Sequence, residues 1–385
     1  MDVLLIGEFS NLHNTLKKGL VASGHRAKII SSGSGFKNLP NDYSIKPRYS
    51  DWLLGNTDGF LLKKIYNIFA KTERGIRFYF LLNEVQKYDV IQLINERSIE
   101  TFSFLEHWFL KKIIQKNKNV FVLSTWVDYI TMNYYLKNKA YTSILQPYFL
   151  NKNLKKHYKY AFYYISRRHH KIHQLLYKKS RGFITTDLDY AIPLQENSKH
   201  LGLIPNPIDV DLIKYIPPII EDKIIIFLGI SDLSYTEKGI EFFVNALKKI
   251  KAQYHDQVEI IIAKNLPYRE YIECYNKCHI LLDQVFSNDQ GFNALEAMAK
   301  GKVVFTGAEK NFLDYYNVKE GEIAINAKAN VDDLVNKLSE LIRNPDKIIT
   351  IGLNARRFVE HRHHYIIQAQ KYVEVWSDSS ISTLP

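Results

Sequence analysis

The segment 290–304 combines a glycine, a run of small and apolar residues with one acid, and a second glycine before a strand. We expect a turn at Gly291, a helix over 292–299 and a helix end at Gly301. The free N–H groups at the start of such a helix can hold an anion. Glu296 lies one turn into this apolar helix, where an ionised carboxylate is costly without a partner. A ribose diol would supply two hydroxyl donors; alternatively, Glu296 caps nearby backbone or pairs with a lysine.

This segment resembles the donor-site signature of glycosyltransferase family 4 (group 1, bacterial type). In that signature a Glu, seven residues and a second Glu precede a small-residue helix that ends Gly-x-x-Val. The resemblance implies that Glu296 binds the donor ribose, and that Gly291, Phe292 and Asn293 offer backbone N–H groups to the sugar or the diphosphate. The first Glu of the pattern falls at Asn288, the position that contacts the donor sugar. This departure affects the identity of the sugar more than the type of reaction.

A second match to the family follows the strand that ends at Gly229. Family members carry Gly-Arg there and Lys-Gly at the start of the next helix, and both cations hold the donor diphosphate. This chain keeps Lys238 but has Ile230 in place of the arginine. A second cation would therefore come from elsewhere, for example Lys264 or Arg269. The alternative for Lys238 is an ordinary solvated residue at a helix start.

Two further positions concern the acceptor. The loop from Gly7 to His13 resembles the family's N-terminal loop over the catalytic crevice, although its usual double glycine is absent. The resemblance implies that Gly7 lies near the donor and His13 faces the acceptor; otherwise a lone loop histidine is simply exposed. Asp128 follows a strand, at the edge of the sheet where ligands bind. Its carboxylate could take the acceptor proton or bind hydroxyls, or it could cap a helix.

Buried strand patterns alternate with helical patterns along the chain. We expect strands at 3–6, 27–30, 90–93, 120–124, 182–186, 202–204, 223–228, 258–263, 279–283 and 303–306. We expect helices after the first strand and at 239–251, 268–277, 292–299, 331–343, 348–361 and 365–376. Such βα series require parallel sheets. The sequence thus predicts an α/β protein with two Rossmann-like, doubly wound domains facing a central crevice, the GT-B arrangement.

The domain boundaries follow from the prolines between the two βα series. The acceptor-side domain is expected at 1–205, a linker at 206–222 and the nucleotide-sugar donor domain at 223–361. The last segment, 362–385, carries a helix that we expect to return to the first domain.

Composition limits the compartment and the cofactors. The two cysteines, Cys274 and Cys278, are too few for a disulfide framework and fit a reducing cytosol. No apolar run approaches the roughly 18 residues of a membrane span. We expect no metal and no cofactor. His169 with His173, and the histidines of 361–364, are interpreted as solvated helix faces. Asp187-Leu-Asp189 and Asp209-Val-Asp211 have only the spacing of a metal motif.

Charge is uneven in this chain of net charge +12, since no acid lies between Asp128 and Asp187. The window 137–181 holds many Lys and Arg residues with interleaved aromatics, and a helical periodicity over 154–177 would gather them on one face. Such a face would bind an anionic membrane. We therefore expect a cytoplasmic protein, peripheral on the inner face of the plasma membrane; the alternative is a highly soluble surface.

The expected reaction is retaining transfer of a sugar from a UDP- or GDP-sugar to a hydroxyl of a glycan or lipid-linked acceptor. The pathway would be cell-surface glycan or glycolipid synthesis. Two alternatives stay open: a GT-B nucleotide-sugar 2-epimerase, and a non-catalytic basic protein that binds nucleic acid or lipid. No nucleic-acid module is recognised, so nucleic acid is not an expected partner.

Overall fold

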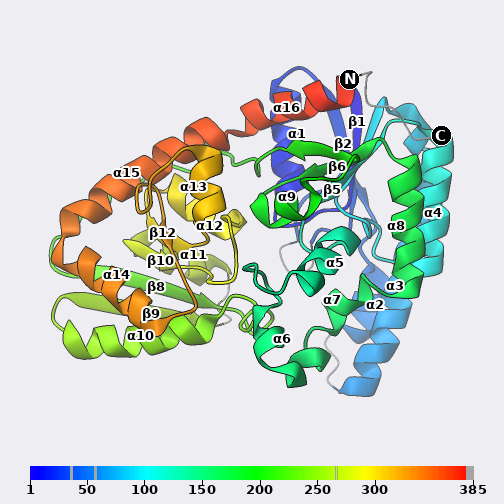
Figure 1. The fold of residues 1–385 in the computed structure, drawn as a ribbon. Helices are drawn as coiled ribbons and strands as arrows, with labels where there is room; N and C mark the ends of the chain where they lie inside the picture. The colour runs from blue at the N-terminus through cyan, green and yellow to red at the C-terminus, as the bar shows by residue number, and fades with distance from the viewer. Residues whose placement is uncertain (35–37, 56–58, 265, 267, 379–385) are drawn as a thin grey trace.

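The computed structural model describes residues 1–34, 38–55, 59–264, 266 and 268–378. It contains two parallel sheets, each with helices on both faces (Figure 1). The first sheet has seven strands in the order β3-β2-β1-β4-β5-β6-β7, and the second has five in the order β12-β11-β10-β8-β9. The predicted fold class, two doubly wound α/β units, is confirmed. We call the parts that carry these sheets the first half and the second half.

The strands of the first half lie where short β-branched runs predict them. They are β1 (Asp2–Ile6), β2 (Arg26–Ser31), β3 (Tyr43–Ser44), β4 (Val90–Leu93), β5 (Val120–Ser124), β6 (Gly182–Thr185) and β7 (His200–Leu203). Both faces of β1, β4 and β5 are buried, as a sheet covered by helices requires. The short strand β3 was not predicted.

The helices that cover this sheet come largely from segments without a distinctive pattern. They are α1 (Leu12–Ala22), α2 (Arg48–Leu54), α3 (Phe60–Leu81), α4 (Ser103–Lys116), α5 (Tyr129–Lys137), α6 (Gln146–Leu150), α7 (Lys159–Tyr163), α8 (Arg167–Lys179) and α9 (Leu188–Leu194). The single helix predicted over 154–177 is wrong. The short turn η3 (Lys152–Lys156), α7 and α8 replace it, and the Ser166 hydroxyl caps the start of α8 by accepting from His169 N–H.

The second half follows the predicted βα series closely. Its strands are β8 (Ile224–Ile230), β9 (Val258–Lys264), β10 (Ile280–Leu282), β11 (Val303–Thr306) and β12 (Ile325–Asn326). Its helices are α10 (Ile240–Gln253), α11 (Tyr268–Lys277), α12 (Phe292–Ala299), α13 (Lys310–Tyr316), α14 (Val331–Arg343) and α15 (Pro345–Arg362). Both cysteines are free.

The last helix, α16 (Tyr365–Ser377), lies across the first half (Figure 1). Its Ala369, Tyr372 and Trp376 share a buried cluster with residues of β1 and α1. The contact is close: a Cβ on Gly19 of α1 would lie 2.3 Å from the carbonyl oxygen of Tyr365. The Trp376 indole N–H also donates to the Gln92 side chain of β4, at 3.1 Å.

Candidate active site

A buried carboxylate organises the predicted donor edge of the second sheet. Asp283 directly follows β10, and its Oδ1 accepts from Lys238 Nζ at 2.7 Å and from Asn293 Nδ2 at 3.0 Å. Its Oδ2 lies 3.4 Å from the Thr306 hydroxyl at the end of β11. Two residues predicted separately, Lys238 and Asn293, are therefore held together at the start of α12. The part played by Asp283 was not predicted.

Steric constraints explain why a glycine follows Lys238. Gly239 has a φ of 65°, and a Cβ there would lie 2.3 Å from the Val285 side chain and 2.9 Å from the Phe286 ring. The Val285 N–H donates to the Lys238 carbonyl at 3.0 Å. Glycine is required because both the conformation and the space exclude a side chain. The lysine backbone is thereby fixed against the loop after β10.

The missing arginine position, Ile230, packs against the apolar core of the second half and offers no cation. Its register partner on the neighbouring strand is Lys264, whose ammonium lies 3.1 Å from Asp232. Lys264 is therefore positioned beside the place that the family's arginine would occupy, and its side chain is 61% exposed. The side chain of Arg269, the other candidate, lies outside the described residues.

The start of α12 lacks a side-chain cap, and its role as an anion site stays a prediction. Gly291 is the N-cap residue, with extended backbone and no side chain that caps the helix. Phe292 packs against the apolar clusters of both halves, so α12 begins where the halves meet. Glu296 is half-buried and close enough for its charge to favour protonated Lys300, whose pKa is lowered overall by burial. Pairing with a lysine and binding a ribose both remain compatible with this position.

Asn288, expected at the donor sugar, instead joins the two halves. Its side-chain amide donates to Asp189 Oδ1 at 2.7 Å and to the Thr142 carbonyl at 3.0 Å, and its backbone N–H donates to the same carboxylate at 2.8 Å. The Ser287 hydroxyl also donates to Asp189. This buried amide is occupied by protein groups rather than presented to a ligand.

The Asp187-Leu-Asp189 motif is therefore part of this contact between the halves. Asp187 caps α9 by accepting from Asp189 N–H, and Asp289 of the second half accepts from Leu188 N–H at 3.1 Å. Burial raises the pKa of all three carboxyl groups. Within the described residues there is no group of three His, Cys, Asp or Glu side chains that could hold a metal.

The N-terminal loop is more enclosed than expected. His13 is fully buried in the first turn of α1, and its Nδ1 lies 2.8 Å from the Gly7 carbonyl. The interpretation of His13 as an exposed loop residue is wrong. Burial lowers its pKa to about 4, so the ring is neutral near pH 7. Gly7 has a φ of 86°, and a Cβ there would lie 2.3 Å from Ile94.

Asp128 caps a helix, which was the alternative to a role at the acceptor. Its Oδ1 accepts from Thr131 N–H at 2.7 Å at the start of α5, and the side chain is 3% exposed. Burial, with the nearby charge of Glu96, raises its pKa. A role in binding the acceptor stays a prediction for this residue.

An aromatic group that sequence reasoning did not single out lies at the same edge of the first sheet. Trp126, two residues after β5, has a φ of 67° and is 40% exposed. Its ring lies 5.3 Å from that of Phe9 and 5.9 Å from that of Tyr160, with which it is stacked. A bulky residue in the left-handed region is strained and indicates a functional constraint. The sequence feature that could have revealed this aromatic group is a tryptophan just beyond the carboxyl end of a buried strand.

A second contact joins this aromatic group to the donor side. Tyr160 donates to Glu237 Oε1 at 2.9 Å, and His157 Nε2 lies 2.8 Å from the same oxygen. Glu237 is buried and directly precedes Lys238. The basic window thus contacts the second half one residue from the proposed phosphate ligand.

The two histidine groups are not solvated helix faces. His169 and His173 of α8 are buried, and their ring nitrogens lie 2.7 and 2.6 Å from the Glu96 carboxylate. His363 is buried, with its Nδ1 2.9 Å from the Asn206 carbonyl oxygen, and His364 caps the start of α16. Of the histidines in 361–364, only His361 is exposed on a helix as expected. Periodicity within one helix cannot reveal a partner that lies about 70 residues earlier in the chain.

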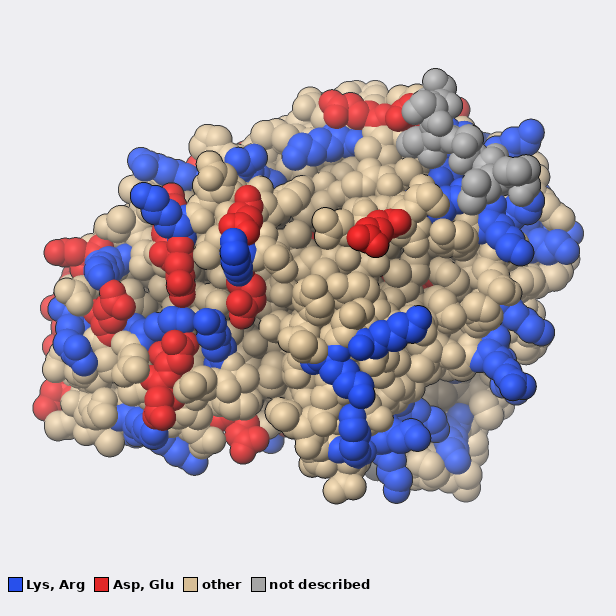
Figure 2. All heavy atoms as spheres, in the orientation of Figure 1, with Lys and Arg blue, Asp and Glu red and all other residues tan. Residues whose placement is uncertain are grey.

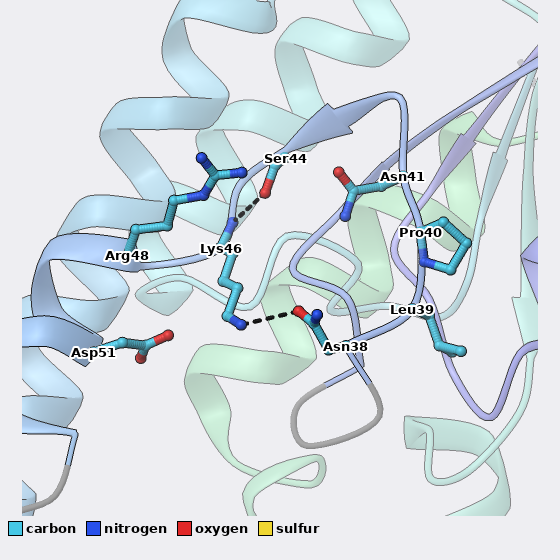
Figure 3. A pocket seen from close by; sticks show the side chains of 8 residues that line it. All are labelled: Asn38, Leu39, Pro40, Asn41, Ser44, Lys46, Arg48 and Asp51. Carbon is cyan, nitrogen blue, oxygen red and sulfur yellow. Dashed lines mark hydrogen bonds between the residues drawn. The ribbon is translucent and has the colours of Figure 1, made fainter.

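A polar hollow of about 510 Å³ lies in the first half beside β3 and α2 (Figure 3). Lys46 and Arg48 are its cations, and the Lys46 ammonium donates to Asn38 Oδ1 at 3.0 Å. None of its lining residues belongs to the donor edge described above.

Comparison with known proteins agrees with this geometry. Residues 237–374 match the family model described as "Glycosyl transferase-like". No curated protein matches the sequence. Sucrose-phosphate synthase from Thermosynechococcus elongatus superposes with a TM-score of 0.62 at 13% identity over 98% of each chain. HepE from Anabaena, solved with UDP, gives 0.59 at 12% identity over 98% of this chain and 100% of the other.

Two further solved structures share the fold at lower similarity. A TarM variant from S. aureus, in complex with UDP and glycans, gives a TM-score of 0.55 at 10% identity over 98% of this chain and 99% of the other. A putative UDP-N-acetylglucosamine 2-epimerase from Listeria monocytogenes gives 0.51 at 10% identity over 97% and 94%. The likeness to these solved structures shows the GT-B fold, and the second half matches the glycosyl transferase-like family model.

The buried Glu96–His169–His173 group yields a stability prediction. Burial alone would raise the pKa of Glu96, but the hydrogen bonds from the two histidines outweigh it and lower the pKa to about 2. Glu96→Gln removes the charge that both rings contact, so we expect a loss of about 3–5 kcal/mol in the free energy of unfolding. Urea unfolding at pH 7 measures this loss.

The pH dependence of the same group has a defined sign. Because the folded pKa of Glu96 is depressed, its stabilisation is present above the ordinary pKa near 4.5 and is lost as pH falls toward 2. The difference in stability between wild type and Glu96→Gln should therefore shrink on acidification. The exposed Glu320→Gln serves as control. A pH-independent difference would contradict the assignment.

Proposed function

We propose that this enzyme transfers a sugar from a nucleoside-diphosphate donor, UDP- or GDP-linked, to an acceptor hydroxyl with retention of configuration. The observation that supports a donor site most directly is the Asp283 carboxylate, which holds Lys238 and Asn293 together at the start of α12. This place combines an ammonium group, an uncapped helix N-terminus and the carboxyl edge of a parallel sheet. Each of these features favours a diphosphate.

In this proposal the protein stabilises the leaving group. As the bond between the anomeric carbon and the diphosphate breaks, negative charge grows on the phosphate oxygens. Lys238, Lys264 and the N–H groups of α12 would face that charge. The acceptor oxygen bonds to the anomeric carbon on the same face, and its proton passes to the departing phosphate oxygen. Glu296 would bind the ribose; no carboxylate is assigned as covalent nucleophile.

The acceptor would bind on the first half, at the aromatic group formed by Phe9, Trp126 and Tyr160. Half-exposed aromatic rings offer an apolar face to the C–H side of a sugar ring, and hydroxyls at its edge remain hydrated. A glycan or lipid-linked acceptor for cell-surface synthesis fits this surface. HepE with UDP and TarM with UDP and glycans support the same ligand classes.

A donor panel tests the reaction itself. Release of UDP or GDP from each nucleotide-sugar is measured with and without glycan or lipid extracts. Acceptor-dependent release with a new glycosidic product supports transfer. A 2-epimerase, the second candidate because of the Listeria monocytogenes relative, would release an altered free sugar without any acceptor.

Glu296→Ala is expected to weaken donor binding at least about tenfold. Each charge-assisted hydrogen bond from the ribose is worth about 1.5–3 kcal/mol. Calorimetry with the donor identified by the panel measures the affinity. Glu320→Ala, an exposed acid of the same half, should bind normally. Unchanged affinity in Glu296→Ala would remove the ribose assignment.

Lys238→Gln is expected to lower kcat by about 100-fold and to change the donor KM much less. Charge on the leaving diphosphate is greater in the transition state than in the ground state. Glutamine can still donate to Asp283, which limits damage to the fold. Lys249→Gln removes an exposed lysine–aspartate pair between α10 and α14, and this variant is the control. If Lys238→Gln and Lys249→Gln had the same kcat, Lys238 would not stabilise the leaving group and its role would be structural.

Trp126→Ala is expected to raise the acceptor KM roughly tenfold, since an apolar face of the sugar loses its cover. Donor affinity should stay unchanged, because Trp126 belongs to the first half. Trp126→Tyr keeps an aromatic ring and should restore most of the acceptor affinity. Should alanine and tyrosine behave alike, the ring would not be the acceptor contact.

A further inference from the structure

Helix α3 turns an apolar face toward solvent along its whole length. The large exposed side chains of this face are Leu61, Leu62, Ile68, Phe69, Ile76, Tyr79 and Phe80, and Phe60 is also exposed at the start of the helix. At 3.6 residues per turn, the seven side chains from Leu61 to Phe80 lie within about 120° of one another around the helix axis, so they share one face. Away from this face, Ala70 and Phe78 are buried. This helix is therefore apolar on both sides, although only one side has a partner within the chain.

The neighbouring helices extend this face. Tyr79 of α3 stacks on Trp108 of α4 with 6.3 Å between ring centroids, and Phe104 lies one turn before Trp108 and is 69% exposed. On α2, which packs against α3, Trp52 is 81% exposed. We call these exposed side chains of α2, α3 and α4 the α3 surface. Single exposed apolar residues are ordinary, but a contiguous group of this kind marks an interaction site.

The charges around the α3 surface are basic. The cations of the three helices are Arg48, Lys63, Lys64, Lys71, Arg74, Arg77, Lys111, Lys112 and Lys116. Lys64 lies over the Phe60 ring at 4.4 Å, and Lys112 lies over the Trp108 ring at 5.8 Å. Figure 2 shows Lys and Arg gathered over the lower part of the first half, whereas the second half mixes both signs.

The acids of these helices are engaged inside the protein. Glu73 accepts from the Arg77 guanidinium and from Ser50, and Asp51 accepts from the Tyr66 hydroxyl. Glu106 is fully buried and accepts from the backbone N–H groups of Ile99 and Thr101. The described acids of α2, α3 and α4 are therefore held by groups of the protein, and the charged side chains of these helices are mainly basic.

The apolar face and its basic surroundings distinguish between two partners for the α3 surface, a second copy of the chain and a lipid bilayer. A second copy of the chain would bring one basic rim against another, which opposes association. An anionic bilayer can bind both the apolar face and the basic residues around it. The apolar face enters the boundary between headgroups and acyl chains, and the lysines contact the lipid phosphates. Aromatic residues and lysines together are the composition of membrane-surface helices.

We propose that the α3 surface docks on an anionic lipid bilayer, with α3 lying parallel to the membrane plane. The 22 residues of α3 span about 33 Å. Among the described residues, no helix is long and apolar enough to cross a membrane. Docking would therefore be interfacial. It does not depend on which reaction the enzyme performs.

This assignment moves the membrane contact away from the basic window 137–181. The aromatics of that window have partners inside the protein: Tyr158 is buried, Tyr160 bonds to Glu237, and Tyr163 contacts the Ser103 hydroxyl. At its surface the window keeps Tyr141 and Leu150 as large exposed apolar side chains, fewer than the α3 surface presents. In Figure 1, α2 and α3 lie at the lower right, away from the second half, so docking leaves the donor edge open.

Vesicle flotation tests the proposal with the full chain. Wild type should float with phosphatidylglycerol-containing vesicles and not with phosphatidylcholine vesicles. Leu61→Ser, Phe69→Ser and Phe80→Ser together should lower partition by at least roughly tenfold, because large apolar groups are lost from the interface. The control Leu212→Ser with Ile219→Ser removes equally exposed apolar side chains from the segment between the halves and should float normally.

A second measurement does not rely on the triple variant being folded. Brominated lipid in the vesicles should quench the fluorescence of wild type, and Trp52→Phe should lose a large part of that quenching. Floating that survives in the triple variant but disappears when Lys155, Lys156, Arg167 and Arg168 become Ser would overturn the proposal in favour of the window. Absence of floating and quenching with both lipids would also overturn it, as would a wild-type dimer that the triple variant dissociates.

Discussion

Burying a carboxylate costs free energy unless hydrogen-bond donors surround it, and Asp283 has such donors at the centre of the second sheet's carboxyl edge. It receives the ammonium of Lys238, the amide of Asn293 and the hydroxyl of Thr306 from three separate segments. Each of those segments must therefore be in place before the others are held correctly. The glycine at 239 and the loop that follows β10 can be understood as the backbone geometry that this convergence demands.

The same edge is also where the halves of the enzyme meet. Asp189 and Tyr160 reach from the first half to Asn288 and Glu237 of the second. Both acceptors of these contacts are buried carboxylates, and burying them without donors would cost several kcal/mol. The relative position of the halves is thus coupled to residues that flank the proposed phosphate and sugar sites. A change in how the halves contact each other would be felt at the donor site without any direct contact to a ligand.

Much of the fold followed from local patterns, because short β-branched runs and capped helices carry their own signals. The βα series of the second half was predicted closely, including α11, α12 and α14, but α13 and β12 were not predicted. The region between β3 and β4 was not predicted, because α3 carries apolar residues on its exposed face as well as on its buried one; α4, α5 and α9 were not predicted either. At the site, Lys238 and the α12 segment could be found from their motifs. Asp283, Glu96 and Trp126 could not, because their roles depend on partners distant in sequence or on a backbone conformation.

Helix α16 has a consequence for how the protein is made. The strands of the first half are translated before the second half. The apolar cluster of the first half nevertheless includes Ala369, Tyr372 and Trp376, which are translated after the second half. Between the end of β7 and the start of α16, translation of the intervening residues takes on the order of ten seconds. During that time α1 presents an uncovered apolar face, including the contact surface at Gly19. Completion of the N-terminal core is therefore a late event of biosynthesis, since the apolar surface of α1 is covered only after α16 has been made.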